Sequence, residues 1–397
     1  MRKLKSLTLL SILVFALTGC GAGKEEEVFE QGNIMPLFGP IMETENAYYY
    51  TTNDFKYELH YYDKASGKSI FLCNKPECSH DGNEFCAATA GGRFVMYTDM
   101  YKDGIYVAAL EPEENRVDKK LFKVSLDGTK LETIATFGYE PTDGGFGHGY
   151  DSEKYMVIYQ GKAFIPYTTP REDGFNNYGT AIVDIESGKV EYLEECDGRK
   201  LQGQEKYIPY GEYLYYYEVG PRRSFIILYR YHISRETVEE IPINGDFVDY
   251  CIVDGRVVYS QMDEDGFVHF YSMNPDNPDN PETTDLTGPL TAADGTPLLG
   301  EWEGALRYDG EYLMTFSYPG KSKGGFIYYI FSKDGTLLTE FTPPETINRE
   351  MSPDFAIMNG YVYFADYGST VRCDLQDLLN GNPTWTTLFY TGAEEEE

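Results

Sequence analysis

The stretch DGIYVAAL (103–110) is followed by LFKVSLDGTKLETIA (121–135), and together these two stretches decide the fold. In the first, an Asp-Gly turn leads into a strand rich in β-branched and aromatic residues; in the second, two strands flank another Asp-Gly turn. Glycine accepts the positive φ that tight hairpin turns require. The two patterns therefore predict two successive β-hairpins, which make one four-stranded antiparallel sheet.

Both patterns occur seven times and alternate along the chain, while no long window shows the 3.6-residue apolar period of a helix. The Gly or Asn of the first pattern recurs roughly every fifty residues, which is the spacing of propeller blades. The recurring positions are Asn46, Gly104, Gly161, Gly211, Gly255, Gly310 and Gly360. We predict an all-β fold over residues 36–392, a β-propeller of four-stranded antiparallel blades, with seven blades favoured over six or eight.

The repeat resembles the TolB-like and related bacterial propellers in general shape. It contains neither the Asp box of sialidases nor a WD40 or kelch consensus. The resemblance implies a propeller fold and, because the family pattern carries no single activity, no particular function.

Composition excludes two classes of protein. The 397 residues include 33 Lys plus Arg against 65 Asp plus Glu, for a net charge of −32. A nucleic-acid binder needs clustered cations for phosphate contacts, so we expect no nucleic acid as a partner. With 42% hydrophobic and 15% aromatic residues, the chain also has too much apolar material to be disordered.

The N-terminus has the features of an export signal. Arg2, Lys3 and Lys5 precede an apolar run over 7–17, which is shorter than the ~20 residues that cross a bilayer. The following L-T-G-C resembles the bacterial lipobox, and this resemblance implies cleavage after residue 19 and lipidation of Cys20. The alternative is a buried apolar helix that happens to end in Cys.

The lipobox resemblance divides the chain into a signal peptide (1–19), a lipidated Cys with an acidic linker (20–35), the propeller (36–392) and an acidic tail (393–397). It implies a palmitate-bearing lipoprotein anchored to the cell membrane and displayed at the cell surface, on the extracytoplasmic face. Cleavage removes three cations and no acids, so the mature chain has a charge of 30 minus 65, or −35. Anionic lipid headgroups should repel such a domain.

Four potential ligands lie within fourteen residues after the first predicted blade. Cys73, Cys78, His80 and Cys86 form C-x4-C-x-H-x5-C, and three thiolates with one imidazole are a ligand set for a closed tetrahedral zinc site. The alternative, which the export signal favours, is a disulfide, Cys78 to Cys86 or Cys73 to Cys86, because an exported protein can keep thiols oxidised. Free thiols are a third possibility. A metal site and a disulfide would each make the segment a structural cross-link, and zinc is the one cofactor that the sequence suggests.

Ligand binding is expected at the mouth of the central channel, where loops vary over a rigid scaffold. Trp302 lies between Glu301 and Glu303, and an aromatic ring beside carboxylates suits a sugar. Asp249, Asp354 and Arg93 lie near equivalent strand starts. Alternatively, Trp302 packs between blades, and the charged residues cap strand ends or pair with one another.

The sequence contains no G-x-S-x-G elbow and no H-E-x-x-H motif. We therefore expect a non-catalytic module that binds a glycan, a peptide or an envelope partner. The alternative is a surface glycoside hydrolase or lyase that uses carboxylates at the channel mouth. A third possibility is a scaffold for a neighbouring transporter or enzyme complex.

Overall fold

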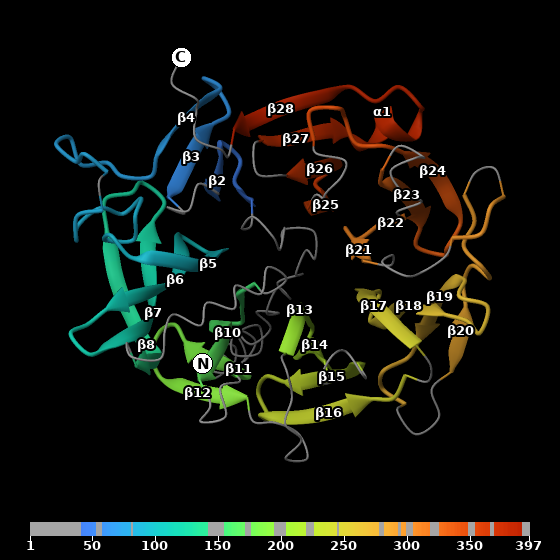
Figure 1. Ribbon diagram of the computed structural model, residues 1–397, viewed down its shortest axis with the longest axis horizontal. Helices are drawn as coiled ribbons and strands as arrows, with labels where there is room; N and C mark the ends of the chain where they lie inside the picture. Colours follow the sequence, from blue (N-terminus) through green and yellow to red (C-terminus); the bar gives the residue numbers. More distant parts are fainter. Residues whose placement is uncertain are drawn as a thin grey trace, which may run out of the picture.

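The computed structural model is a ring of seven four-stranded antiparallel sheets, each made of four consecutive strands (Figure 1). It describes residues 41–52, 58–80, 82–141, 155–170, 176–193, 204–219, 226–243, 246–277, 282–292, 295–298, 305–317, 325–347, 354–365 and 369–390. The predicted seven-bladed β-propeller is confirmed. The predicted lipidation site Cys20, the acidic linker (20–35) and the acidic tail (393–397) lie outside the described residues.

Blades 1 to 4 follow one another along the chain. Blade 1 contains β1 (Met42–Glu43), β2 (Ala47–Thr51), β3 (Leu59–Asp63) and β4 (Lys68–Phe71). Blade 2 contains β5 (Phe94–Tyr101), β6 (Gly104–Pro112), β7 (Arg116–Ser125) and β8 (Leu131–Pro141). Blade 3 contains β9 (Val157–Tyr159), β10 (Lys162–Pro170), β11 (Asn176–Asp184) and β12 (Val190–Leu193). Blade 4 contains β13 (Gln204–Tyr210), β14 (Tyr213–Val219), β15 (Ile226–His232) and β16 (Thr237–Ile241).

Blades 5 to 7 complete the ring, with one helix inserted in the last blade. Blade 5 contains β17 (Asp246–Val253), β18 (Arg256–Met262), β19 (Val268–Met273) and β20 (Thr283–Asp285). Blade 6 contains β21 (Arg307–Tyr308), β22 (Tyr312–Ser317), β23 (Ile327–Ser332) and β24 (Leu337–Phe341). Blade 7 contains β25 (Asp354–Met358), β26 (Tyr361–Ala365), β27 (Ser369–Asp374), α1 (Leu375–Leu379) and β28 (Trp385–Tyr390).

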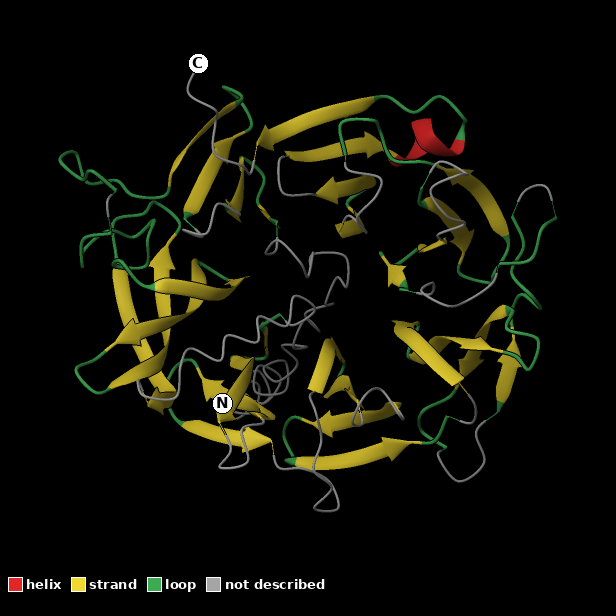
Figure 2. Ribbon diagram, in the orientation of Figure 1, coloured by secondary structure: helices red, strands yellow, loops and turns green. Residues whose placement is uncertain are grey.

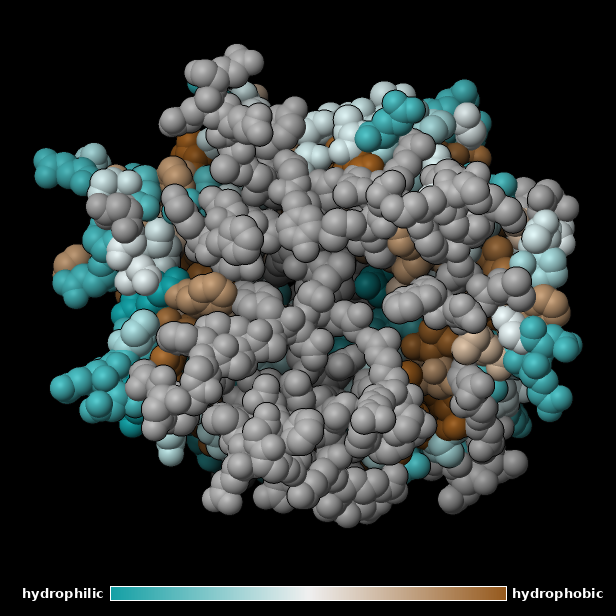
Figure 3. Space-filling view, in the orientation of Figure 1, coloured by the Kyte–Doolittle hydropathy of each residue, from teal (hydrophilic) through white to brown (hydrophobic). Residues whose placement is uncertain are grey.

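The hydrophobic core lies between blades rather than inside any one of them. The described apolar side chains form six clusters, and each cluster joins residues of neighbouring blades around the ring. In blade 1, the second strand β2 is buried along its whole length, whereas the outer strand β4 is mostly exposed. In the space-filling view, described residues along the outer rim are mostly hydrophilic (Figure 3). A single blade therefore has no core of its own, and the ring must assemble to bury its apolar faces.

Tyrosine suits these interfaces because its ring packs between sheets while its hydroxyl reaches the backbone of the next blade. Tyr155 and Tyr159 of blade 3 donate to the carbonyls of Tyr207 (3.3 Å) and Gly211 (2.9 Å) in blade 4. Blade 1 contacts blade 2 in the same way, because Tyr49 donates to the Leu126 carbonyl at 3.3 Å. Part of the unusual count of 36 tyrosines is therefore structural.

The ring closes where blade 7 lies next to blade 1 (Figure 2). The rings of Tyr50 and Phe389 stack with centroids 3.7 Å apart and planes 8° from parallel. Nearby, the Asn359 amide donates to Glu43 Oε2 at 2.8 Å. Ring closure thus adds an aromatic stack and a hydrogen bond to the apolar cluster between the two blades.

The helix α1 departs from the predicted strand-turn-strand pattern of the seventh repeat. Asp374 caps it by accepting hydrogen bonds from the backbone N–H groups of Gln376 and Asp377. Leu375 and Leu378 are buried on one face. In the part of the chain that the structure describes, no helix has the length and apolar character needed to cross a lipid bilayer.

Candidate functional site

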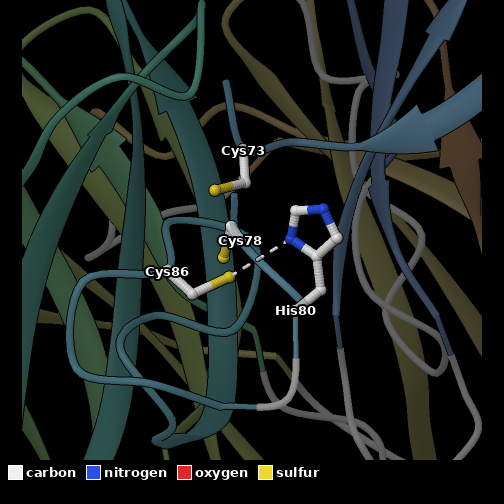
Figure 4. A group of neighbouring side chains, drawn as sticks. All are labelled: Cys73, Cys78, His80 and Cys86. Carbon is white, nitrogen blue, oxygen red and sulfur yellow. Dashed lines mark hydrogen bonds between the residues drawn. The ribbon is translucent and has the colours of Figure 1, made fainter. Parts of the chain in front are cut away.

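The Cys and His residues singled out in the sequence converge on one point (Figure 4). The sulfur atoms of Cys73, Cys78 and Cys86 and a ring nitrogen of His80 all lie within 4.8 Å of one another. The Cys86 Sγ is 3.6 Å from the His80 Nδ1. Tetrahedral zinc with ordinary Zn–S and Zn–N bonds places its ligand atoms about 3.6–3.8 Å apart. The cluster therefore has close to the dimensions that one such ion requires.

The chain brings these residues together without regular secondary structure. They lie in the connection from β4 to β5, whose described part contains neither helix nor strand. A turn positions Cys78, whose N–H donates to the Lys75 carbonyl at 3.0 Å. His80 has a left-handed φ of 55°, and its ring stacks on Phe71 with centroids 4.5 Å apart. The last residue of β4 thereby fixes the plane of the imidazole.

Cys86 lies on the buried side of the cluster. Its N–H donates to the Asn83 carbonyl at 3.0 Å, and its carbonyl accepts from the Gly91 N–H at 2.7 Å. Burial raises the pKa of the Cys86 thiol to about 11. By contrast, a hydrogen bond from the Asn83 side chain, 3.3 Å from Cys78 Sγ, holds the pKa of Cys78 below its usual value. In the absence of a metal, Cys78 is therefore more acidic than Cys86.

The backbone at Gly92 passes close to the backbone at Gly82, and we call this contact the crossing. Gly92 has a φ of +77°, and a Cβ placed on it would lie 1.9 Å from the Gly82 carbonyl oxygen. Position 92 therefore requires glycine both for its backbone angle and for space. The crossing returns the chain to β5 soon after Cys86.

The arrangement bears on the choice between a metal site and a disulfide. All three cysteines of the cluster are free thiols in this structure. A disulfide would use two sulfurs and would not explain why an imidazole nitrogen faces them. A four-ligand metal site uses every member of the cluster.

Asp249 lies on β17, the first strand of blade 5, and its carboxylate is engaged within the protein. Both of its oxygens lie 2.7 Å from Lys206 Nζ, and they also accept the N–H groups of Tyr250 (2.8 Å) and Leu306 (2.6 Å). Lys206 donates further to the Leu306 carbonyl at 2.8 Å. These contacts link blades 4, 5 and 6.

Lys206 was not identified from the sequence. It lies at a register shift in β13 and has a left-handed φ of 51°. Such a bulge turns a side chain out of the regular alternation of the strand. Burial lowers the pKa of Lys206 to about 8 despite the neighbouring Asp249.

Arg93 is also engaged within the protein. Its Nε donates to Glu111 Oε1 at 2.7 Å, its Nη1 donates to the Ala90 carbonyl at 2.8 Å, and its guanidinium lies 4.6 Å from the Phe122 ring centroid. These contacts anchor the chain where it enters β5.

The structure does not describe the side chains of the remaining predicted ligand-binding residues. Glu301, Trp302 and Glu303 lie outside the described residues. Asp354 is the first residue of β25, opposite Ala365, and only its backbone is described. Their proposed role in ligand binding therefore stays a prediction.

Asp99, on β5, is another residue that was not identified from the sequence. Its Oδ2 accepts the N–H of Ile158 in blade 3 at 2.6 Å, and its Oδ1 accepts the N–H of Met100 at 2.8 Å. Burial raises the pKa of Asp99 to about 7. An isolated Asp in an aromatic strand gave no signal of this bond between blades.

No family model matches the chain, and no curated protein sequence matches it. Solved structures do resemble it. The GH74 xyloglucanase from Xanthomonas campestris matches with a TM-score of 0.56 and 11% identity over 91% of this chain and 55% of the xyloglucanase. A prolyl endopeptidase matches with a TM-score of 0.55 and 10% identity over 90% of this chain and 50% of the endopeptidase.

A puromycin-hydrolysing peptidase of Mycobacterium tuberculosis matches with a TM-score of 0.50 and 11% identity, over 93% of this chain and 56% of the peptidase. The chain thus spans about half the length of each of these three structures. At such low identity the likeness establishes the fold and no activity. By its own strand order the chain is a seven-bladed β-propeller, and its likeness to these structures is a likeness of fold.

Proposed function

We propose that this protein is a lipid-anchored, extracytoplasmic propeller that binds a ligand without converting it. The observation that carries the proposal concerns the first strands of the blades. Every carboxylate there whose side chain the structure describes, namely Glu43, Asp99 and Asp249, joins its blade to a neighbour. Acid–base catalysis needs carboxylates that can reach a substrate, and these three are committed to the ring.

The ligand class follows from the predicted channel mouth. An indole flanked by two carboxylates can stack on the apolar face of a sugar and accept hydrogen bonds from its hydroxyls. The fold is also shared with a xyloglucanase and with peptidases, so polysaccharides and peptides are the first ligands to screen. A net charge of −32 disfavours strongly acidic polymers as partners.

Binding and turnover should be measured on the same preparation of the full-length chain. We expect micromolar or tighter binding to a member of a glycan or peptide array, with no new reducing ends and no peptide cleavage. Trp302→Ala should weaken this binding at least tenfold. Trp385→Ala is the matched control. The ring centroids of Trp385 and Phe364 in blade 7 lie 5.5 Å apart, so this substitution should leave the affinity of the folded protein unchanged.

Catalytic turnover would overturn the proposal in favour of a surface glycoside hydrolase or lyase. In that case Glu301→Gln or Glu303→Gln should abolish product formation. Capture of a transporter or enzyme subunit, with no glycan or peptide bound, would instead identify a scaffold.

Anchoring is tested separately. The resemblance to a lipobox supports acylation of Cys20, and two lipid chains would hold the propeller stably at a membrane. We expect Cys20→Ala to prevent incorporation of labelled palmitate and to release the chain from the membrane fraction. Unchanged labelling would contradict the anchor and would leave the binding proposal standing.

A further inference from the structure

We infer that Cys73, Cys78, His80 and Cys86 form a closed, structural zinc site that holds blade 1 against blade 2. The four ligand atoms come from four side chains of one short segment, and all lie within 4.8 Å of one another. This inference does not depend on the proposed binding function.

The donor set selects the metal. Three thiolates and one imidazole in a tetrahedral arrangement suit zinc, whereas calcium and magnesium prefer oxygen ligands. Because the protein supplies four ligands, no position remains for water or substrate. A site of this kind contributes stability to the fold and performs no chemistry.

The surroundings orient the ligands as outer contacts of a metal site do. Stacking on Phe71 directs His80 Nδ1 toward the sulfurs, 3.6 Å from Cys86 Sγ. The Asn83 amide donates to Cys78 Sγ at 3.3 Å, and Thr89 hydrogen-bonds Cys86. Three thiolates with one Zn²⁺ carry a net charge of −1, which these hydrogen bonds partly offset.

The position of the cluster explains what the ion would stabilise. Cys73 follows β4 of blade 1, and the N–H of its neighbour Asn74 donates to the Gly128 carbonyl of blade 2 at 3.3 Å. Beyond Cys86, Ala87 and Ala90 are buried in the cluster shared by blades 1 and 2. One ion would thus fix both ends of an irregular segment that packs between two blades.

Within the described chain, the alternative disulfide has a weaker structural basis. Any pairing of two cysteines would leave the third thiol and the oriented imidazole without a role. A disulfide would also require two sulfur atoms about 2.05 Å apart, whereas all three cysteines are free thiols in this structure.

The first experiment is metal analysis of the full-length chain purified without reductant or added metal. We expect one zinc per chain, and three thiols that react with a thiol reagent only after chelation. Replacement of zinc by Co²⁺ should give the intense visible absorption of tetrahedral cobalt bound to thiolates. These readouts use the wild-type chain and do not depend on the folding of a variant.

Variants then test the ligand set. Cys78→Ser and His80→Ala should each lower zinc content at least tenfold or, where zinc remains, change the cobalt spectrum. Cys251→Ala is the matched control, because Cys251 is a buried thiol in blade 5 and should leave one zinc per chain.

Three results would overturn the inference. A mass two daltons below that of the reduced chain, with no metal, would establish a disulfide. Stoichiometric iron would assign the cluster to another metal. Full zinc content with an unchanged cobalt spectrum in both ligand variants would place the ion elsewhere.

Discussion

Asp99 and Asp249 connect successive blades through the same pair of hydrogen bonds. In each, one carboxylate oxygen accepts the N–H of the following residue at 2.8 Å, and the other accepts an N–H from the start of the next blade at 2.6 Å. The two residues lie at different positions along their blades. Asp99 pairs with Tyr106, the third residue of β6, whereas Asp249 pairs with Ser260, the fifth residue of β18. The same hydrogen-bond pattern therefore occurs in two blades, but at positions that are not equivalent in the repeat.

The two carboxylates differ in charge compensation, and this predicts a pH dependence. Lys206 faces Asp249 directly, whereas burial raises the pKa of Asp99 from its ordinary 3.8 to about 7. The folded state therefore binds a proton at Asp99 more tightly than the unfolded state does. The stability that this group contributes is complete below about pH 4 and is lost as the pH rises toward 7.

We expect the urea midpoint of the wild type to fall between pH 5 and pH 7 more steeply than that of Asp99→Asn, which stays neutral. Asp103→Asn is the control, because the hydrogen bond from Lys123 lowers the pKa of Asp103 and keeps it ionised over this range. Parallel curves for the wild type and Asp99→Asn would contradict the prediction.

Removing the buried cation should be far more damaging than removing an exposed one. Lys206→Met would remove the cation that contacts both oxygens of the buried Asp249 and would leave only the longer contact with Arg307, whose Nη1 lies 3.7 Å from Asp249 Oδ2. Breaking a buried ion pair costs about 3–5 kcal/mol in unfolding free energy. Lys333 makes an ion pair of the same 2.7 Å length with Asp254, but these side chains are 54% and 64% exposed. Lys333→Met should therefore cost about 0–1 kcal/mol. Equal losses in urea unfolding would show that burial does not govern the Lys206 pair.

Chelation should loosen one segment before it unfolds the ring. The described part of 72–93 has no strand or helix of its own, so we expect the inferred zinc site to order it. We expect hydrogen exchange of residues 73–92 to speed up at least tenfold after chelation, while β18 in blade 5 remains protected. Restored protection on adding zinc back would establish reversibility, and unchanged exchange would argue against a metal cross-link.

The architecture could be predicted because the signals that determine it are local. Gly161, Gly211, Gly255, Gly310 and Gly360 each take the positive φ that the turns of the repeat suggested, at 59° to 105°. The expectation was wrong for Gly104, which is the first residue of β6, and Lys102 takes the left-handed φ of 53° in that turn. The apolar strands between them can be buried only by neighbouring blades. Repetition of one turn and one strand pattern thus determined both the blade and the ring.

Features that depend on contacts between distant residues could not be predicted in the same way. Lys206 and Asp249 are far apart in sequence, and a bulge turns Lys206 into reach of its partner. The short helix α1 did carry a signal, an Asp cap at Asp374 and a glycine at Gly381, but it is too short to show a helical period. The convergence of His80 with the three cysteines was predicted as one of several alternatives, because spacing alone does not distinguish a metal site from a disulfide or from free thiols.

The crossing of Gly82 and Gly92 gives a test that separates backbone strain from lack of space. Gly92 and Gly161 have nearly the same φ, +77° and +75°, but a Cβ at Gly92 would meet the Gly82 oxygen at 1.9 Å whereas one at Gly161 would meet nothing within 4 Å. Gly161→Ala should lower the free energy of unfolding by about 1–2 kcal/mol, because alanine is strained in the left-handed conformation. Gly92→Ala should cost more in urea unfolding and should also lower zinc content, because the segment must open to admit the methyl group. Equal costs, with zinc content unchanged in Gly92→Ala, would show that the crossing does not hold the cluster together.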